Sequence, residues 1–325
     1  MPDRANRRYT AALVGLGRIA WRFDANRTGG AALTHFGSYR RNPRIDVVGG
    51  FSPVAQDRID FGNVCGVETR ERFEDIIEKR PDIVSICSPS EAHFEQTLAC
   101  LDREIPMIWL EKPPTLELHE LDKLINHPAC HAGKARVLVN YGRRYAKTYE
   151  QLRAIYREQS LGRPLAIQLL YSRGLELNGS HFLDLAFSML GDRPPLELVI
   201  AQSERQKPSP TFILQFGGDF VVSMCGHDAS YHISDAVLVC DGGRASVLSG
   251  GLEARIEQKS ENELHAGFFR LKQTESRLLG ASVADDWFSS ALSDLIDAHE
   301  MGRQPCSNLT TARHTQAVIE EVRRG

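Results

Sequence analysis

The feature that most constrains this chain is the alternation, over roughly its first half, of short apolar runs with amphipathic helical segments. Near-continuous apolar runs rich in β-branched residues are typical of strands buried on both faces of a sheet. The runs are Ala11–Gly15, Asp46–Phe51, Asp82–Cys87, Pro106–Leu110 and Arg136–Asn140, and the helical segments are Thr34–Asn42, Phe73–Lys79, Glu91–Asp102 and Leu116–Ile125. This order predicts an α/β domain of the Rossmann type, with a doubly wound parallel sheet.

The second half has a different pattern, with several strands in succession. The predicted strands are Leu165–Tyr171, Leu196–Gln202, Thr211–Phe216, Asp219–Met224, Ala236–Cys240 and Ala245–Leu248, with a turn at Gly217-Gly218. The predicted helices are Lys147–Gln159, Gly179–Leu190, Asp285–His299 and Thr310–Val322, the last of them capped by Asn308 or Thr310. The pattern indicates an α+β domain on a mostly antiparallel sheet. The 325 residues therefore divide into domains 1–143 and 144–325, and we expect the last helices to pack back on the first.

Composition excludes several classes of protein. The formal net charge is −3, so we expect no nucleic-acid partner. The seven cysteines are scattered without a CxxC pair, which argues against a disulfide framework and against a metal site. No apolar run is long enough to span a membrane and no secretory signal is evident, so we expect a cytoplasmic protein without a membrane partner.

A glycine-rich turn follows the first predicted strand directly. Gly15-Leu16-Gly17-Arg18-Ile19-Ala20 has the form GxGxxA. Glycines permit a tight turn and let backbone N–H groups approach a pyrophosphate. The position of the turn predicts dinucleotide binding by Gly15, Gly17, Arg18, Ile19 and Ala20. The polar segment that follows, residues 21–33, is interpreted as an insertion, either an ordinary surface loop or a segment that contacts substrate.

The end of the second strand bears on which dinucleotide binds. A carboxylate there would hold the ribose 2′-hydroxyl of NAD, and this chain has Phe51-Ser52-Pro53 instead. Ser52 can donate a hydrogen bond to a 2′-phosphate without repelling it, and Arg58 can assist. The sequence thus favours NADP over NAD slightly.

Two further strand ends carry polar residues, at the edge where doubly wound sheets bind ligands. Ser88, Pro89 and His93 follow the third strand, and Glu111 and Lys112 follow the fourth. We expect all five to contact the cofactor. Lys112 can also hold a substrate hydroxyl; the alternative is an exposed structural lysine.

The segment Asn178-Gly179-Ser180-His181-Phe182-Leu183-Asp184 opens a helix of the second domain. His181 and Asp184 are three residues apart and share a helical face. A histidine at such a position can accept a hydroxyl proton. We therefore predict His181, Asn178, Asp184 and Lys112 as the catalytic residues, although a lone helical histidine is more often structural.

These pieces together resemble the Gfo/Idh/MocA family of oxidoreductases over nearly the whole chain. The resemblance is carried by GLGRIA, SPSEAH, EKP, VNYGRRYAKTYEQLR followed by LGRP, HFLDLAFSMLG and DWFSSALSDLIDAHEMGRQPCSN, in this order. It implies a Rossmann domain followed by a domain with a large open sheet. It further implies NAD(P)-dependent hydride transfer at a sugar or cyclitol carbon, with Lys112 and His181 transferring the proton. Homodimers or homotetramers through the open sheet are also implied.

One position departs from the family pattern. Many of its dehydrogenases have an aspartate four residues before the helix histidine, and here that residue is Leu177, followed by Asn178. An asparagine orients a hydroxyl but accepts no proton at ordinary pH. The NGSH form resembles members associated with bacterial surface polysaccharides, which suggests a nucleotide sugar or another glycan precursor.

Three functions remain open at this level. Besides hydride transfer, the chain is compatible with an NAD-using glycosidase or lyase without net redox change, and with a non-catalytic nucleotide-binding protein. The exact substrate, the reaction direction and the oligomer number are not determined. Substrate contacts are suggested by location alone for Arg22, Arg27, His35, Arg143, Arg144, Tyr145 and Arg173, and surface salt pairing explains most of the arginines equally well.

Overall fold

The computed structural model describes residues 7–217, 220–278 and 286–324, which form two compact units. The first unit comprises Met1–Gly142 and Asp286–Arg313, and the second comprises Arg143–Asp285 and His314–Gly325. The chain therefore leaves the first unit, returns to it for one helix and ends in the second.

The first unit is built on a six-stranded parallel sheet with the order β3-β2-β1-β4-β5-β6. The strands are β1 (Tyr9–Val14), β2 (Ile45–Phe51), β3 (Thr69–Arg70), β4 (Ile83–Ile86), β5 (Met107–Leu110) and β6 (Arg136–Val139). The strand order reverses between β1 and β4, which is the switch point where such sheets bind ligands. The predicted doubly wound Rossmann fold is confirmed; β3, only two residues long, was not predicted.

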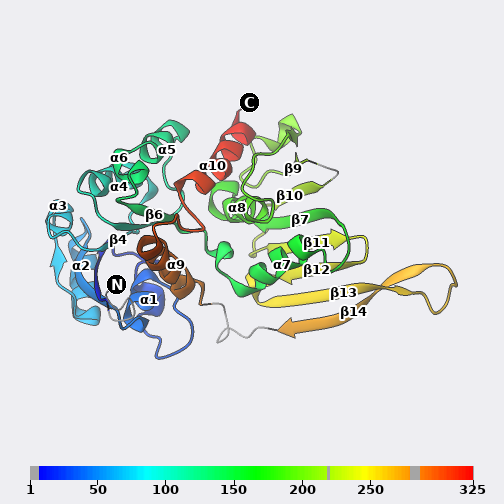
Figure 1. The fold of residues 1–325 in the computed structure, drawn as a ribbon, viewed down its shortest axis with the longest axis horizontal. Helices are drawn as coiled ribbons and strands as arrows, with labels where there is room; N and C mark the ends of the chain where they lie inside the picture. Colours follow the sequence, from blue (N-terminus) through cyan, green and yellow to red (C-terminus); the bar gives the residue numbers. More distant parts are fainter. Residues whose placement is uncertain (1–6, 218–219, 279–285, 325) are drawn as a thin grey trace. The chain divides into compact units, whose positions relative to one another are not determined.

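Helices cover both faces of this sheet (Figure 1). They are α1 (His35–Arg41), α2 (Ala55–Cys65), α3 (Glu74–Ile77), α4 (His93–Asp102), α5 (Leu118–Ile125), α6 (Pro128–His131) and α9 (Trp287–Met301). Helices α1 and α9 pack together on one face, and α4 packs with α5 and α6 on the other. The sequence did not predict α2, because only Phe61 of this helix is buried and no apolar stripe results.

The second unit contains an eight-stranded, mostly antiparallel sheet with the order β14-β13-β12-β11-β7-β10-β9-β8, in which only the β7–β10 pair is parallel. The strands are β7 (Pro164–Ser172), β8 (Glu197–Ile200), β9 (Phe212–Gln215), β10 (Val221–His227), β11 (Ser234–Cys240), β12 (Gly243–Leu248), β13 (Glu253–Glu261) and β14 (Phe269–Leu278). The predicted α+β architecture with a large open sheet is confirmed.

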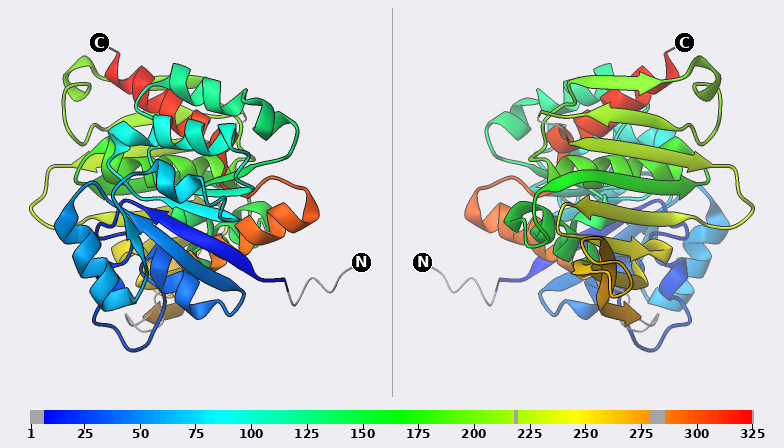
Figure 2. Two further views of the ribbon diagram at one scale, coloured as in Figure 1. Left: turned by 90° about the vertical axis from the view of Figure 1, so that its left-hand side faces the viewer. Right: turned by 90° about the vertical axis from the view of Figure 1, so that its right-hand side faces the viewer.

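Two helices, α7 (Lys147–Glu158) and α8 (Ser180–Met189), lie on one face of this sheet, and Figure 2 shows the strands of the opposite face without a helix in front of them. Helix α10 (Leu309–Arg323) begins in the first unit and ends in the second. The Asn308 side chain accepts the amides of Thr310 and Thr311, so Asn308 caps this helix as predicted.

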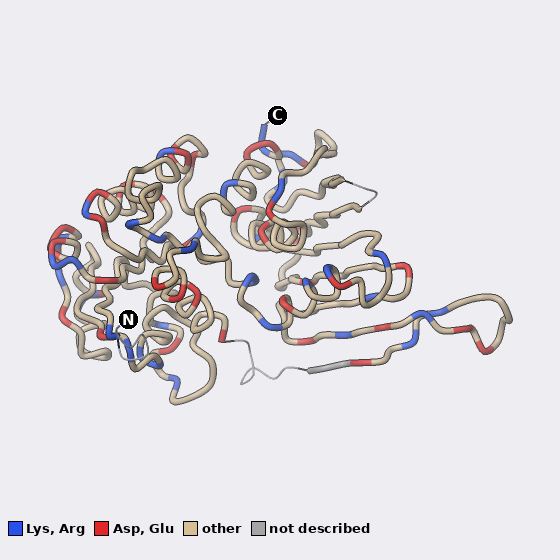
Figure 3. The backbone as a smooth tube through the Cα atoms, in the orientation of Figure 1, with Lys and Arg blue, Asp and Glu red and all other residues tan. Residues whose placement is uncertain are grey.

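The hairpin of β13 and β14 extends beyond the other strands of its sheet (Figure 1). It was not predicted, because its residues are largely charged and partly or fully exposed on both faces, so no apolar alternation marks them. Basic and acidic residues are interspersed along it (Figure 3). The predicted turn at Gly217-Gly218 and the start of the predicted strand Asp219–Met224 include Gly218 and Asp219, and the predicted helix Asp285–His299 includes Asp285; these three residues lie outside the described ones.

No helix within residues 7–217, 220–278 and 286–324 is both long enough and apolar enough to cross a membrane.

Candidate functional site

The glycine-rich turn lies where strand ends of the first unit meet. The Gly15 amide donates to the Phe51 carbonyl at the end of β2 (2.8 Å). Gly15 has a φ of +85°, and a Cβ on it would lie 2.4 Å from the Ser88 nitrogen, so only glycine fits there. A Cβ on Gly17, by contrast, would meet nothing within 4 Å. This open approach to the backbone fits a dinucleotide pyrophosphate.

Residues 21–34 form an insertion in the helix that follows the turn. The amide of His35, the first residue of α1, donates to the carbonyl of Ile19 (3.2 Å). The amide of the next residue, Phe36, donates to the carbonyl of Ala20 (2.9 Å). Two backbone hydrogen bonds thus join the start of α1 to the residues before the insertion. Inside it, the buried Asp24 carboxylate accepts the Leu33 amide (2.9 Å) and the Thr34 hydroxyl (2.7 Å). The predicted insertion is a folded segment anchored by its own buried acid.

A carboxylate of α2 that the sequence analysis did not predict lies beside the loop after β2. The Ser52 hydroxyl donates to Asp57 (3.2 Å), which lies in the first turn of α2. Arg22 of the insertion pairs with Asp57 (2.7 Å) and Asp60 (3.1 Å). Arg58 donates to the Ser52 carbonyl (2.8 Å). Ser52 is therefore surrounded by one acid and two guanidinium groups.

His93 connects two of the predicted cofactor-binding segments. Its Nε2 lies 2.9 Å from the Ser88 carbonyl and its Nδ1 lies 2.7 Å from the Pro113 carbonyl. The Ser88 hydroxyl donates to Gln96 (2.5 Å). The buried His93 thus holds the loop after β4 against the loop after β5, which carries Lys112.

Glu111, immediately before Lys112, is the end point of a buried hydrogen-bond chain. Its Oε1 accepts from His35 Nε2 (3.0 Å), and His35 Nδ1 lies 2.9 Å from the Ser85 hydroxyl. The Ser85 oxygen is 2.5 Å from the hydroxyl of Tyr39. Because the carboxylate only accepts, the network assigns the proton to Nε2 of His35 and directs each hydroxyl donor towards Glu111.

A second chain reaches the same carboxylate from the neighbouring strands. Trp109 Nε1 donates to Asn140 Oδ1 (3.0 Å), and Asn140 Nδ2 donates to Glu111 Oε1 (2.5 Å). Burial raises the pKa of Glu111, but the bonds from His35 and Asn140 and the charge of Lys112 outweigh it and hold the pKa below the usual value. Glu111 is therefore an ionised, fixed carboxylate beside the backbone of Lys112.

His181 lies in the second unit, in the first turn of α8. A π-helical turn, Leu175–Gly179, precedes α8 and contains Asn178 and Leu177, the latter 53% exposed. Such turns occur frequently at functional sites. Asn178 Nδ2 donates to the Ser172 carbonyl (2.9 Å) and lies 3.0 Å from His232 Nε2. Asn178 is thus fixed between the end of β7 and His232.

Asp184 is fully buried and contacts Arg144, which follows β6 in the chain. The guanidinium group donates to both carboxylate oxygens (2.8 to 3.0 Å) and also to Asp192 (2.7 and 3.1 Å). The two carboxylates raise the pKa of Arg144, although burial opposes this, so the guanidinium stays charged. Arg153 donates to the carbonyls of Arg143 and Arg144 (3.0 and 2.5 Å). This ion-pair cluster attaches α8, and with it His181, to the segment after β6.

The structure thus brings together two groups of predicted residues. In the first unit Gly15, Gly17, Ser52, Ser88, His93, Glu111 and Lys112 follow neighbouring strand ends; in the second unit Asn178, His181 and Asp184 follow one another on one helical segment. Sequence reasoning missed Asn140, Ser85 and His232. Asn140 had a usable signal, since it is a polar residue directly after a buried strand, as Glu111 is; nothing local distinguishes the other two.

Comparison with known proteins identifies the first unit more closely. Residues 10–141 match the family model described as "Oxidoreductase family, NAD-binding Rossmann fold", named GFO_IDH_MocA. Residues 10–141 therefore match the NAD-binding Rossmann domain of the Gfo/Idh/MocA oxidoreductase family, in agreement with the predicted resemblance.

Curated proteins and solved structures are also similar to this chain. Inositol 2-dehydrogenase of Rhodococcus erythropolis is 27% identical over 154 residues, 47% of this chain and 40% of that protein, so the match spans less than half of the relative's length. UDP-N-acetylglucosamine 3-dehydrogenase from Acidithiobacillus ferrooxidans has a TM-score of 0.75 at 17% identity, covering 97% of this chain and 96% of that one. A mutant 3-ketoreductase from Actinomadura kijaniata, solved with TDP-benzene and NADP, has a TM-score of 0.76 at 16% identity, covering 98% of both chains. At these identities the solved structures establish the shared fold.

Proposed function

We propose that this protein is an NAD(P)-dependent oxidoreductase that transfers hydride to or from a CH–OH carbon of a sugar, cyclitol or nucleotide sugar. The observation that carries the proposal is the open backbone at Gly17, at the switch point of a Rossmann sheet whose adjacent strand ends hold Ser88 and Lys112. The bound nicotinamide would supply the hydride acceptor or donor. The residues of the chain would bind, orient and exchange the hydroxyl proton.

Lys112 is the first proposed proton-transfer residue. Its backbone amide lies 3.3 Å from Glu111 Oε2, and the same carboxylate is fixed by His35 and Asn140. A rigid carboxylate bonded to the lysine amide limits the positions that the lysine backbone can take. We propose that Glu111, His35 and Asn140 position Lys112 rather than contact substrate.

His181 is the second proposed proton-transfer residue. Asp184, on the same helical face, has both oxygens bound by Arg144. We therefore propose that Asp184 positions α8. Leu177 stands where many family dehydrogenases have an aspartate, and we propose that the neighbouring Asn178 orients the substrate hydroxyl instead.

The cofactor preference follows from the Ser52 loop. We propose that NADP is preferred, because Ser52 offers a hydroxyl and the guanidinium groups of Arg22 and Arg58 lie at this loop, where a 2′-phosphate could compete for them. Both are already paired with carboxylates, Arg22 with Asp57 and Asp60 and Arg58 with Glu71, and these acids oppose the preference. Replacing Ser52 by aspartate would add a second carboxylate and should weaken NADPH binding about tenfold or more relative to NADH.

The proposal is tested by fluorescence titration of the purified protein with NADPH and NADH. Gly17→Ala should fold like the wild type, because a Cβ there meets no atom, but should weaken nucleotide binding at least about tenfold by occupying the pyrophosphate approach. Gly217→Ala in the second unit, where a Cβ also meets nothing, is the matched control and should bind normally.

Nucleotide binding that survives in Gly17→Ala, or its absence in the wild type, would overturn the proposal. Turnover of a sugar with a stoichiometric change in nicotinamide absorbance separates hydride transfer from a glycosidase or lyase with no net redox change. Loss of that turnover in both Lys112→Ala and His181→Ala, with nucleotide binding retained, separates an enzyme from a non-catalytic binding protein.

We also propose self-association through the sheet face of the second unit that no described helix covers. Leu196, Val199 and Ile213 are between 41% and 77% exposed on β8, β9 and the residue before β8. Sedimentation velocity of the wild type and of Val199→Glu tests this proposal.

A further inference from the structure

Two consecutive arginines of the second unit have opposite surroundings. Arg144 is bound by the carboxylates of Asp184 and Asp192. Arg143, partly buried, forms no ion pair within the described ranges of the chain; its Nη2 donates to the Ser234 hydroxyl (2.7 Å), and its guanidinium carbon lies 4.3 Å from the centre of the Phe182 ring. A positive charge that is partly withdrawn from water without a counter-charge is costly unless an anion binds beside it.

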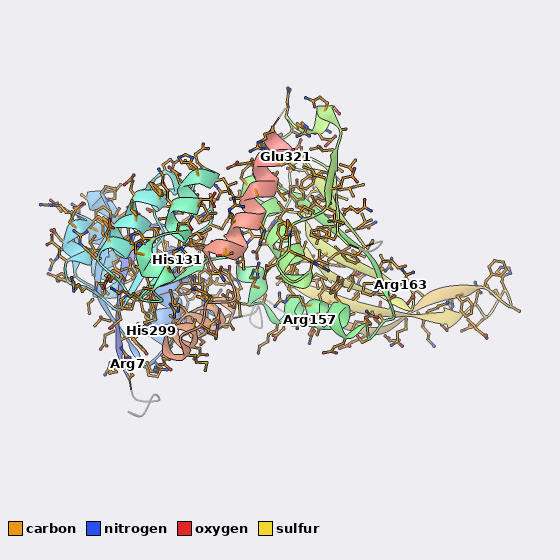
Figure 4. All side chains as sticks on the ribbon, turned by 45° about the horizontal axis from the view of Figure 1, so that its top comes forward. Arg7, His131, Arg157, Arg163, His299 and Glu321 are labelled. Carbon is orange, nitrogen blue, oxygen red and sulfur yellow. The ribbon has the colours of Figure 1, made fainter. Side chains whose placement is uncertain are left out.

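A second arginine without a described counter-charge follows the end of β7. Figure 4 labels Arg163, which precedes this strand; Arg173 follows its other end. Arg173 is exposed, has a φ of +68° and forms no ion pair with any residue of the described segments. A non-glycine residue in this left-handed region is uncommon, and such conformations concentrate at ligand sites.

The two arginines are linked through His232 and Ser234. Ser172, next to Arg173, exchanges hydrogen bonds with Ile233 (2.9 and 3.2 Å), which places His232 and Ser234 at the same end of the β7–β11 pair. Asn178 Nδ2 can only donate, so the 3.0 Å contact makes His232 Nε2 an acceptor and leaves the ring proton on Nδ1.

The charges around His232 agree with this placement. Burial lowers the pKa of His232, the charges of Arg143 and Arg173 lower it further, and Asp235 opposes them. Asp235 itself accepts the Ser249 amide (2.7 Å). Both guanidinium groups therefore act on the imidazole of His232. This imidazole contacts Asn178, which lies three residues before His181 in the chain.

We propose that Arg143 and Arg173, with the Nδ1 donor of His232, form an anion-binding subsite that selects substrates carrying a carboxylate or a phosphate. This inference rests on the proposed function and narrows its substrate class, from sugars in general to acidic sugars or sugar phosphates, including nucleotide sugars. Uncharged cyclitols would leave both guanidinium groups without a counter-charge.

The test is isothermal titration calorimetry of the full-length protein saturated with NADPH, so that phosphates cannot occupy the cofactor site. The probes are sodium D-glucuronate, UDP and neutral D-glucose. We expect glucuronate or UDP to bind at least about tenfold more tightly than glucose and to weaken with added salt. The anion that binds identifies carboxylate or phosphate as the group recognised.

Arg143→Met and Arg173→Met should each weaken the binding of that anion about 10- to 100-fold. Arg143→Lys should restore part of it, because the charge remains. Arg163→Met, which removes an exposed arginine from the other end of β7, is the matched control and should bind like the wild type. Because Arg173 is exposed, its variant keeps the test valid even if Arg143→Met fails to fold.

Anions that bind no more tightly than glucose, or that bind equally to the Arg143 and Arg173 variants, would overturn the inference. The NADPH titration separates this outcome from failure of the proposed function. If NADPH binds and the anions do not, only the anion subsite is refuted. If NADPH does not bind but arginine-dependent anion binding persists without it, the redox function fails and the subsite remains.

Discussion

The two units support their proposed proton-transfer residues with two different kinds of buried cluster. In the first unit, the carboxylate beside Lys112 is held by hydrogen bonds from His35 and Asn140, each backed by a further hydrogen bond. In the second unit, the carboxylate three residues after His181 is held by the guanidinium of Arg144. The first cluster orients the carboxylate of Glu111, whereas the second provides a counter-charge for the carboxylate of Asp184.

The difference indicates what each carboxylate can do. Burial raises the pKa of Glu111, but His35, Asn140 and the charge of Lys112 lower it, so the acid and the lysine interact electrostatically. Burial raises the pKa of Asp184, and Arg144, which binds both of its oxygens, opposes this shift and is its main counter-charge. We therefore expect changes in the first cluster to alter Lys112 and changes in the second to alter stability.

The largest effect should come from Arg144→Met. This change leaves Asp184 buried without a counter-charge, which costs about 3–5 kcal/mol of unfolding free energy. Urea unfolding followed by circular dichroism measures it. Arg163→Met, whose partner Asp241 is 4.0 Å away and exposed, should change stability by less than about 0.5 kcal/mol. A stable Arg144→Met protein would show that the cluster does not hold the unit together.

Glu111→Gln should have the next largest effect, and the effect should depend on pH. The folded pKa of Glu111 lies below its usual value of 4.5, so ionised Glu111 stabilises the fold above that pH and the contribution disappears as pH falls through the folded pKa. At about pH 7 we expect a loss of about 1–3 kcal/mol. The difference in unfolding free energy between wild type and variant, measured by urea unfolding, should shrink below about pH 4.5. A difference that does not change with pH would contradict this prediction.

Asp192→Asn should cost less than removal of Arg144. The Asp192 side chain is 32% exposed, whereas that of Asp184 is completely buried, so water replaces part of what Asp192 contributes. We expect a loss of about 1 kcal/mol in thermal unfolding. A loss as large as that in Arg144→Met would mean that Asp192, and not Asp184, is the essential partner.

Tyr39→Phe should have the smallest effect. It removes the hydroxyl at the far end of the chain that leads through Ser85 and His35 to Glu111. Loss of one neutral hydrogen bond should cost about 0.5 kcal/mol here, at the low end of the usual range, because Ser85 keeps its bond to His35. Nucleotide affinity should be unchanged in the same protein, and a reduced NADPH affinity would show that the chain supports the cofactor loop as well.

The sequence was sufficient for the parts of the fold whose pattern is local. Five of the six strands of the first sheet were predicted, because each is an apolar run, and the Asn308 cap was predicted from its position before a periodic segment. It was insufficient for α2 and for the hairpin of β13 and β14. These elements bury few side chains, so no apolar period distinguishes them from a surface loop.

For the candidate site, the sequence by itself determined which residues follow buried strands: the glycine turn, Ser52, Ser88, Lys112 and, in the second unit, the helix of His181. Tertiary structure alone decided which neighbours those residues have. In the folded protein, Glu111 accepts hydrogen bonds from His35 and Asn140, and Asp184 pairs with Arg144. Asp57 accepts a hydrogen bond from Ser52, and Arg143 has no described counter-charge. Strand position is encoded by the apolar period of a short segment, whereas ion pairs and hydrogen bonds join residues distant in the chain and exist only after the strands pack.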